Sequence, residues 1–254
     1  MRGFEELIAE AGSVDVSGWD FGWLEGRATE ERPPWGYSGM VAGRLPEVGA
    51  ALDLDTGGGE IVAGVAELPR RMVVTEGWRP NFERARRLLE PRGVEVVHVA
   101  PGDGLPFEDG AFDLVTSRHP VEPAWGEISR VLRDGGSYLG QHVGPASAYE
   151  LIEFFVGPLS RENLDRDPER EAAAAREAGL EIGTLRTARC RMEFFDVGAV
   201  VYILRKCVWW VPDFSVERYS ERLRELDALI REQGVFVAHS TRTLIEATAV
   251  SSRR

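Results

Sequence analysis

The sequence contains only two cysteines, Cys190 and Cys207, among its 254 residues. A framework of disulfide bonds needs more cysteines than this, so we expect both side chains to be buried, reduced thiols in a reducing compartment. Cysteine and histidine residues nowhere recur at the spacing of zinc ligands, and we therefore expect no metal site.

Basic residues are scarce relative to acidic ones. The chain carries 30 lysines and arginines against 42 aspartates and glutamates, which gives a formal net charge of −12. Binding of a phosphate backbone requires a positive surface, so this balance argues against nucleic acid as the partner, although it is compatible with a local basic patch.

Long hydrophobic runs are missing as well. The longest apolar stretch, Val197 to Val211, is interrupted by Arg205 and Lys206 and is too short and too charged to cross a bilayer. The N-terminal residues include Glu5 and Glu6 where a signal peptide has an apolar run. We therefore expect a cytoplasmic protein without a membrane partner.

The most informative stretch that is present runs from Ala50 to Glu60. An apolar segment ending in Asp53 is followed by three glycines, and a helix is expected from about Glu60 to Leu68. Glycines allow positive φ angles and close approach of the backbone to a ligand, and the start of a helix presents unpaired N–H groups. A strand, a glycine-rich turn and a helix in this order are typical of nucleotide sites in α/β sheets.

Further apolar segments alternate with helical ones along the chain. Hydrophobic residues make up 43% of the sequence, enough for one large α/β domain. The alternation predicts a doubly wound, Rossmann-like sheet of seven strands, mostly parallel with an antiparallel last strand. The predicted strands are 50–53, 72–76, 94–99, 112–116, 137–143, 180–195 and 235–248.

Polar residues stand at the ends of these strands or just beyond them: Asp53, Glu76, Asp103, Ser117 and His142. Ligands of parallel α/β sheets bind at the carboxyl ends of the strands, so we expect these side chains to share one edge of the sheet. Glu76 follows the glycine turn by about twenty residues, where a carboxylate commonly binds ribose hydroxyls.

The motif spacing argues against two common types of nucleotide site. In a dinucleotide fingerprint that begins at Gly57, the last glycine would stand where Val62 does, which disfavours NAD and FAD. A P-loop requires a lysine after the glycine turn, and none is present.

The ordered motifs resemble instead those of the class I S-adenosylmethionine-dependent methyltransferases. Asp53 to Gly59 matches the family pattern Asp/Glu-x-Gly-x-Gly-x-Gly, with Asp55 in place of the first glycine. Asp tolerates left-handed backbone geometry better than most residues, so the turn can persist. The runs Gly102–Asp113 and Glu127–Gly136 are similar to those of ubiquinone and menaquinone C-methyltransferases and their small-molecule relatives.

The resemblance implies S-adenosyl-L-methionine as the cofactor and assigns its contacts residue by residue. Glu76 corresponds to the acid that binds the ribose, and Asp103 to the acid that meets the adenine amino group. The implied cofactor-binding residues are Asp53, Asp55, Thr56, Gly57, Gly59, Glu76, Gly77, Trp78, Asp103, Gly104, Leu105, Ser117 and Arg118.

Two histidines are candidate catalytic bases. His119 follows the fourth predicted strand, where members of the family place residues that meet the methyl acceptor, and His142 ends the fifth. Imidazole titrates near neutral pH, as a general base requires, although a hydrogen-bonded structural histidine is an equally simple interpretation of each.

The N-terminal segment is rich in aromatic residues and glycine. Three of the seven tryptophans, Trp19, Trp23 and Trp35, precede the first predicted strand. This segment is either a hydrophobic flap over the sheet or a lid over cofactor and substrate. In the second case Trp35 and Tyr37 contact the substrate, as Asp196 and Tyr202 between the last two predicted strands could also do, although aromatic residues at such spacing also form cores.

These observations predict one methyltransferase domain over residues 1–254. It comprises an N-terminal cap (1–45), a cofactor-binding half (46–143) and a substrate-side half (144–254) with a helical insertion. We expect a monomer or homodimer that transfers a methyl group to a small molecule (an activity of the EC 2.1.1 type). Two alternatives stay open, namely a nucleic-acid or protein methyltransferase and a non-enzymatic protein that binds S-adenosylmethionine.

Overall fold

A computed structural model of the chain describes residues 2–18, 21–162 and 164–250. Trp19 of the aromatic segment lies outside the described residues. The chain forms two compact units. Unit 1 comprises Met1–Arg32, Ala146–Leu164 and Arg189–Thr241, and unit 2 comprises Pro33–Pro145, Asp165–Ala188 and Arg242–Arg254. The predicted N-terminal segment 1–45 is thus divided between the two.

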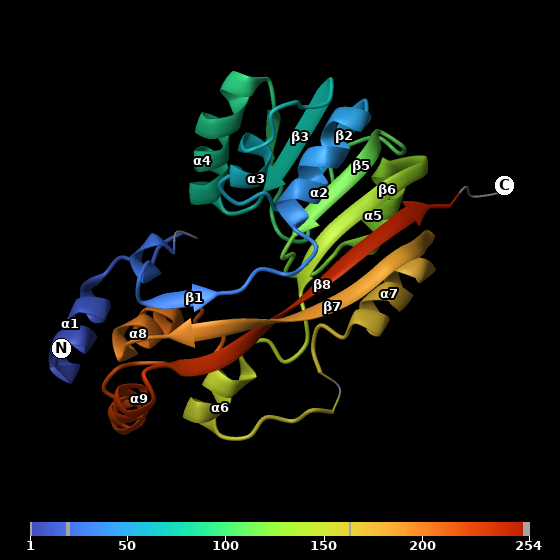
Figure 1. Ribbon diagram of the computed structural model, residues 1–254. Coiled ribbons are helices and arrows are strands. Elements are labelled where there is room, and N and C mark those ends of the chain that lie inside the picture. The colour runs from blue at the N-terminus through green and yellow to red at the C-terminus, as the bar shows by residue number, and fades with distance from the viewer. Residues whose placement is uncertain (1, 19–20, 163, 251–254) are drawn as a thin grey trace. The chain divides into compact units, whose positions relative to one another are not determined.

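Unit 2 contains the parallel strands (Figure 1). Its hydrogen-bonded strand order is β7-β8-β6-β5-β2-β3-β4. Neighbouring strands from β6 through β4 run parallel, and β8 pairs antiparallel with β6. The strands are β2 (Ala50–Leu54), β3 (Arg71–Glu76), β4 (Glu95–His98), β5 (Phe112–Arg118), β6 (Leu132–Val143), β7 (Leu180–Phe194) and β8 (Phe236–Ala249); β7 begins and β8 ends in this unit.

Helices cover both faces of the unit 2 strands (Figure 1). On one face lie α2 (Tyr37–Arg44), α3 (Glu60–Ala63) and α4 (Arg79–Leu89), and on the other lie α5 (Trp125–Val131) and α7 (Pro168–Glu177). Short 3₁₀ turns follow α2 and α4 at Leu45–Glu47 and Glu90–Arg92.

Alternation along the strands produces these two layers. Ala51 and Val74 pack with α2 and α4, whereas their neighbours Leu52 and Val73 pack with α5. Successive side chains of a strand point to opposite faces, so strands that are apolar at consecutive positions require helices on both sides. The apolar runs that predicted buried strands therefore also account for the double winding.

Unit 1 has its own hydrophobic core. It contains α1 (Phe4–Ser13), a 3₁₀ turn (Gly22–Leu24), α6 (Tyr149–Val156), α8 (Val197–Lys206) and α9 (Ser220–Gln233). Helix α8 is buried on nearly all sides, which is typical of a central core helix. Strand β1 (Ala28–Glu30) pairs antiparallel with the last three residues of β7.

The predicted fold class is confirmed, with differences in detail. The described residues contain eight strands rather than seven, because β1 is too short to give an apolar signal. Strand β5 continues through Ser117 and Arg118, which were expected in a loop. Helix α3 ends at Ala63 rather than near Leu68, because the chain turns at Gly64.

An arginine from a distant segment compensates for the short length of α3. Arg92 donates from its guanidinium to the carbonyls of Val62, Ala63 and Val65 at 3.0, 2.8 and 2.6 Å. The last carbonyls of a helix lack partners in a following turn, and here the guanidinium supplies additional donors at and just beyond the helix end. A helix of a single turn has only a small dipole. Helix α3 therefore contributes less to ligand binding than the longer helix expected from the sequence would.

The described residues contain no helix that is long and apolar enough to cross a membrane. The same part of the chain holds no cluster of histidine, cysteine or acidic residues suited to a metal ion. Cys190 and Cys207 are both buried, and burial raises the pKa of the Cys207 thiol to about 12, which keeps it protonated and unreactive.

Candidate functional site

The end of β2 presents a buried carboxylate beside a left-handed turn. Asp53 is 6% exposed, and its Oδ1 accepts a 2.6 Å hydrogen bond from the Thr116 hydroxyl on β5. Burial raises the pKa of Asp53 to about 6, against the lowering effect of that hydrogen bond. Asp55 adopts φ 52°, the geometry that its match to a family glycine predicted, and Gly57 and Gly59 also have positive φ.

The end of β3 is joined to this turn by Glu76. Its Oε2 accepts from the backbone N–H of Gly57 at 2.9 Å, and its Oε1 accepts from that of Trp78 at 2.7 Å. Burial raises the pKa of this carboxyl too. Each carboxylate oxygen keeps a second lone pair, so Glu76 can hold the turn and still accept from a ligand hydroxyl.

Two glycines keep the backbone close at this edge. A Cβ on Gly77 would lie 2.7 Å from the carbonyl oxygen of Val99, and one on Gly59 would lie 2.7 Å from Leu89 Cδ1. The adjacent Trp78 is 45% exposed, an unusually large apolar surface beside buried carboxylates.

Two buried hydroxyls at the same strand ends lack a hydrogen bond of good geometry. Thr56 Oγ1 and Ser117 Oγ form none with a described residue, although Thr56 lies close enough to Asp53, and Ser117 to Tyr138, to lower the pKa of each of those groups. A buried hydroxyl without a partner costs stability unless something satisfies it, so the pair indicates polar ligand groups at the ends of β2 and β5. Asp53, Thr56, Glu76 and Ser117 thus come together as the sequence predicted.

The loop after β4 is fixed by two residues that the sequence analysis did not assign to the site. Arg130 of α5 donates to the carbonyls of Phe107 and Leu105 at 2.7 and 3.0 Å, and Glu127 accepts from the Leu105 N–H at 2.7 Å. The arginine lowers the pKa of Glu127 to about 2. Exposed Asp103, with Gly104, lies in this loop, and its side chain is accessible to a ligand.

His119 occupies a strained position at the end of β5. Its φ is 58°, in the left-handed region, and it directly precedes Pro120, which disfavours helical geometry at the preceding residue. Burial, reinforced by the positive charges of Arg242 and Arg118, lowers its pKa to about 3. Non-glycine residues held in such geometry occur preferentially at functional sites.

A chain of hydrogen bonds connects Trp35 to His119 through Gln141. The indole N–H of Trp35 donates to Gln141 Oε1 at 2.8 Å, and Gln141 Nε2 lies 3.2 Å from His119 Nε2. Gln141 is 3% exposed, so this network is well enclosed. The chain links the predicted substrate residue Trp35 to the predicted catalytic residue His119.

His142 lies elsewhere, in the interior of unit 2. Its Nε2 is 2.7 Å from the Tyr138 hydroxyl and its Nδ1 is 2.5 Å from Glu171 of α7. The ring is fully buried and lies against Trp125. Both ring nitrogens have protein partners, which favours a structural role over that of a base.

The other predicted substrate residues have structural partners. Tyr37 is buried and donates to the carbonyls of Ser117 and Leu139 at 3.0 and 3.3 Å. In unit 1, Asp196 caps helix α8 by accepting from the Ala199 N–H at 2.8 Å, and Tyr202 stacks on Trp23 with ring centroids 4.9 Å apart. Their substrate contacts stay predictions.

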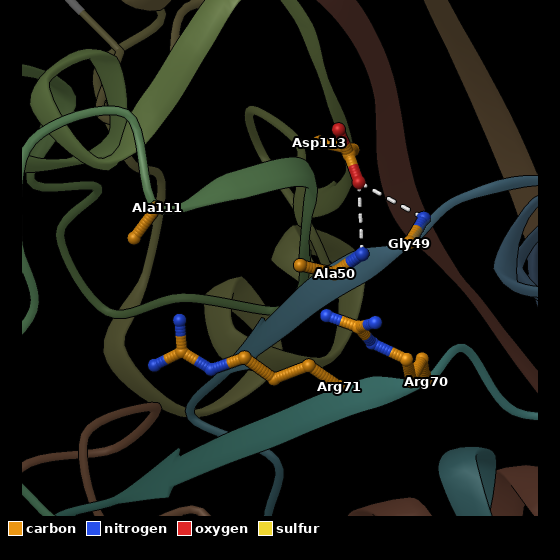
Figure 2. Close-up of a pocket in the computed structure, with 6 residues that line it drawn as sticks. All are labelled: Gly49, Ala50, Arg70, Arg71, Ala111 and Asp113. Atoms are coloured by element: carbon orange, nitrogen blue, oxygen red, sulfur yellow. Dashed lines mark hydrogen bonds between the residues drawn. The ribbon is translucent and has the colours of Figure 1, made fainter.

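A cavity of about 540 Å³ lies at the opposite end of the strands (Figure 2). It is lined by residues at the beginnings of β2, β3 and β5: Gly49, Ala50, Arg70, Arg71, Ala111 and Asp113. Asp113 Oδ2 accepts from the N–H groups of Gly49 and Ala50 at 2.9 and 2.8 Å (Figure 2). Ligands of parallel sheets bind at the other edge, so this cavity is separate from the candidate site.

Comparison with known proteins identifies the central part of the chain. The family described as "Methyltransferase domain" matches residues 52–140. A demethylmenaquinone methyltransferase of Thermus thermophilus is 42% identical over 94 residues, which is 34% of this chain and 43% of the relative. The methyltransferase YcgJ of Bacillus subtilis is 29% identical over 119 residues, which is 43% of this chain and 46% of YcgJ. The matches thus span about half of these relatives.

Solved structures show the same fold over more of the chain. The crystal structure of Bacillus subtilis YcgJ is similar over 85% of this chain and 99% of that chain, with a TM-score of 0.58 and 16% identity. The [4+2]-cyclase SpnF is similar over 85% of this chain and 81% of its own, with a TM-score of 0.52 and 17% identity. Residues 52–140 are thus similar to a methyltransferase domain, and the chain shares its fold with these solved structures.

Proposed function

We propose that this chain binds S-adenosyl-L-methionine at the carboxyl ends of β2, β3 and β5 and transfers its methyl group to a small-molecule acceptor. The observation that carries this proposal is the meeting of two buried carboxylates, Asp53 and Glu76, with the unpartnered hydroxyls of Thr56 and Ser117 at one sheet edge. A ligand with cationic and hydroxyl groups satisfies all four.

The residues present fit this cofactor. Asp53 and Asp55 supply negative charge for its ammonium and sulfonium, and Glu76 accepts from its ribose hydroxyls. Trp78 offers an exposed ring face and Asp103 an acceptor for the adenine. Thr56, Gly57, Gly59, Gly77, Gly104, Leu105, Ser117 and Arg118 complete the proposed contacts.

When bound, S-adenosylmethionine supplies a methyl group already activated by attachment to a positively charged sulfur. The chain therefore needs chiefly to orient the acceptor and exclude water. We assign contact with the acceptor to His119, which directly follows Arg118 at the end of β5. His142 is not included, because both of its ring nitrogens have protein partners.

Several observations bear on the class of acceptor. The menaquinone-type relative favours a small molecule, and the net charge of −12 disfavours nucleic acid. A protein-L-isoaspartate O-methyltransferase of Nitrobacter winogradskyi, 29% identical over 120 residues, keeps a protein acceptor as the second candidate. A non-enzymatic protein that binds S-adenosylmethionine is the third, because a fold does not by itself determine an activity. The cytoplasmic location and the monomeric or dimeric state stay predictions.

Measurement of S-adenosylhomocysteine production tests the proposal. The protein is incubated with S-adenosylmethionine and a panel of phenols, enols, amines and thiols, and each rate is compared with a control without acceptor. We expect at least one acceptor to raise the rate clearly above that control, and an isoaspartyl peptide not to do so. Tight cofactor binding with no turnover across the panel would support the non-enzymatic alternative.

A further inference from the structure

We propose that His119 is a neutral hydrogen-bond donor rather than a base, and that with Arg118 and Arg242 it selects acceptors that bind as an oxyanion. Suitable acceptors carry an acidic hydroxyl, such as a phenol or an enol. This inference rests on the proposed function, because it concerns the acceptor side of the same site.

The hydrogen-bond chain fixes the tautomer of His119. An indole N–H can only donate, so the group of Gln141 that faces Trp35 must be its carbonyl oxygen. The amide nitrogen of Gln141 therefore faces His119 Nε2 and donates to it. A ring nitrogen that accepts carries no proton, so the proton of the neutral ring is on Nδ1.

In this arrangement the His119 ring offers a ligand one N–H donor, at Nδ1. It offers no free lone pair, because the lone pair of Nε2 already accepts from Gln141. Nε2 is engaged by Gln141, and Nδ1 forms no hydrogen bond to any described residue. The side chain is only half-buried. A ligand atom that approaches Nδ1 must accept a hydrogen bond, so an oxygen acceptor fits and a protonated amine does not.

Positive charge surrounds this donor. The charges of Arg242 and Arg118 both act on the His119 ring, and His142 also contributes to lowering the pKa of His119. The strand pairing places these residues at one edge, since Arg118 lies opposite Gln141 and Arg242 opposite Val143. Arg186 adds a further guanidinium 5.9 Å from the Trp35 ring centroid.

The acidic residues of the site belong to other strands. Asp53 and Asp55 extend from β2 and Glu76 from β3, and of these Asp53 interacts with the Arg118 charge. The site therefore has a negative part suited to a cationic cofactor and a positive part suited to an anionic acceptor. A hydroxyl bound beside two guanidiniums and an N–H donor has a lowered pKa, so its proton passes to solvent and no protein base is required.

Binding of p-nitrophenol tests the proposal, because its phenolate absorbs visible light and its protonated form does not. The full chain, saturated with S-adenosylhomocysteine, is titrated at a pH below the pKa of the free phenol. We expect the bound phenol to be converted to phenolate, with its apparent pKa lowered by about one unit or more. No binding, or binding of the protonated phenol, would overturn the proposal.

Variants test which residues bind the phenolate. Arg242→Gln and His119→Phe should each weaken phenolate binding roughly tenfold, the size expected for one charge-assisted hydrogen bond. His119→Asn keeps a donor and should bind more tightly than His119→Phe. Arg70→Gln, at the opposite cavity of Figure 2, is the matched control and should change nothing; a loss there would place the phenolate in that cavity and refute the proposal.

Failure of this inference is distinguishable from failure of the proposed function. Binding of S-adenosylhomocysteine is measured first and alone. If it binds and the phenol is not ionised, the cofactor site stands and the oxyanion inference is wrong. If S-adenosylhomocysteine does not bind, the proposed function is wrong, and the phenol titration without it still decides whether the positive part of the site ionises phenols.

Discussion

At the scale of single residues, the site depends on groups held in states that they do not prefer in water. Asp53 and Glu76 are buried carboxyls with raised pKa values, Asp55 and His119 have left-handed backbones, and Thr56 Oγ1 has no partner. Each of these states is destabilising in the absence of a ligand. Together they indicate a site at which a bound ligand would offset this cost in free energy.

The protonation state of His119 gives the first prediction. The ring should stay neutral from about pH 5 to pH 8, because burial and two arginine charges lower its pKa to about 3. Nitrogen-15 NMR of histidine-labelled protein should show a proton on Nδ1 and none on Nε2. Trp35→Phe should relax this preference, because it frees the Gln141 amide to turn. A ring that titrates near pH 6.5 in the native protein would contradict the account.

Asp53 provides a prediction about pH and stability. Its pKa rises from 3.8 in the reference state to about 6 in the fold, so the folded protein binds more protons than the unfolded chain between these values. Stability on account of Asp53 should therefore fall as the pH rises through this window. Asp53→Asn should raise the free energy of unfolding at neutral pH by about 1 to 3 kcal/mol.

The same substitution should weaken cofactor binding, because it removes the negative charge proposed to face a cationic group. Wild-type affinity for S-adenosylmethionine should accordingly fall as the pH drops through about 6, where Asp53 becomes protonated. Denaturant unfolding and calorimetric titration measure the two effects separately. If Asp53→Asn lowered the stability and left the affinity unchanged, both the destabilising burial of the Asp53 charge and its contact with the cofactor would be refuted.

At the scale of elements, local sequence signals predicted what local interactions determine. The glycine turn, the strand ends at Asp53 and Glu76, and the motif from Gly102 to Asp113 are each contained in a short window. The end of α3 was missed because its stabilising partner, Arg92, comes from another segment. Strand β1 was missed because its three residues, Ala28–Glu30, are too few to show a hydrophobic pattern.

The acceptor side could not be predicted in the same way. The hydrogen bond between Trp35 and Gln141 joins residues 106 positions apart, and nothing near Gln141 in the sequence marks it. Two histidines appeared equivalent in the sequence, and only packing distinguishes them. His142 is enclosed by Tyr138 and Glu171, whereas His119 keeps one ring nitrogen without a protein partner.

The loop after β4 provides a prediction for α5. Arg130→Gln removes the charged donor that holds the carbonyls of Leu105 and Phe107, so residues 102–107 should exchange amide hydrogens faster. Affinity for S-adenosylhomocysteine should fall about three- to tenfold, because the loop must then be ordered on binding. Arg133→Gln, on the strand that follows, is the control and should leave loop exchange unaltered.

At the scale of the whole molecule, the proposed cofactor contacts all belong to unit 2. Unit 1 has a separate core in which Tyr202 stacks on Trp23. Tyr202→Leu should lower the free energy of unfolding by about 1 to 3 kcal/mol through loss of that aromatic contact, and leave affinity for S-adenosylhomocysteine unchanged. A large loss of cofactor affinity in this variant would mean that Tyr202 takes part in the site.

At this scale the net charge of −12 bears on the kind of partner that the protein binds. It disfavours polyanionic partners, yet in our proposal Arg118 at the end of β5 and Arg242 of β8 give one small anion a favourable position. Composition therefore predicts which class of partner is disfavoured. The strand register indicates where positive residues lie close together in this otherwise acidic chain.

The central claim is that the carboxyl ends of β2, β3 and β5 bind S-adenosylmethionine, and calorimetric titration with S-adenosylhomocysteine tests it most directly. We expect one site per chain in the wild type, at least tenfold weaker binding in Glu76→Gln, and no change in the control Glu95→Gln at the beginning of β4. Absence of binding in the wild type, or equal affinity in the two variants, would contradict the account.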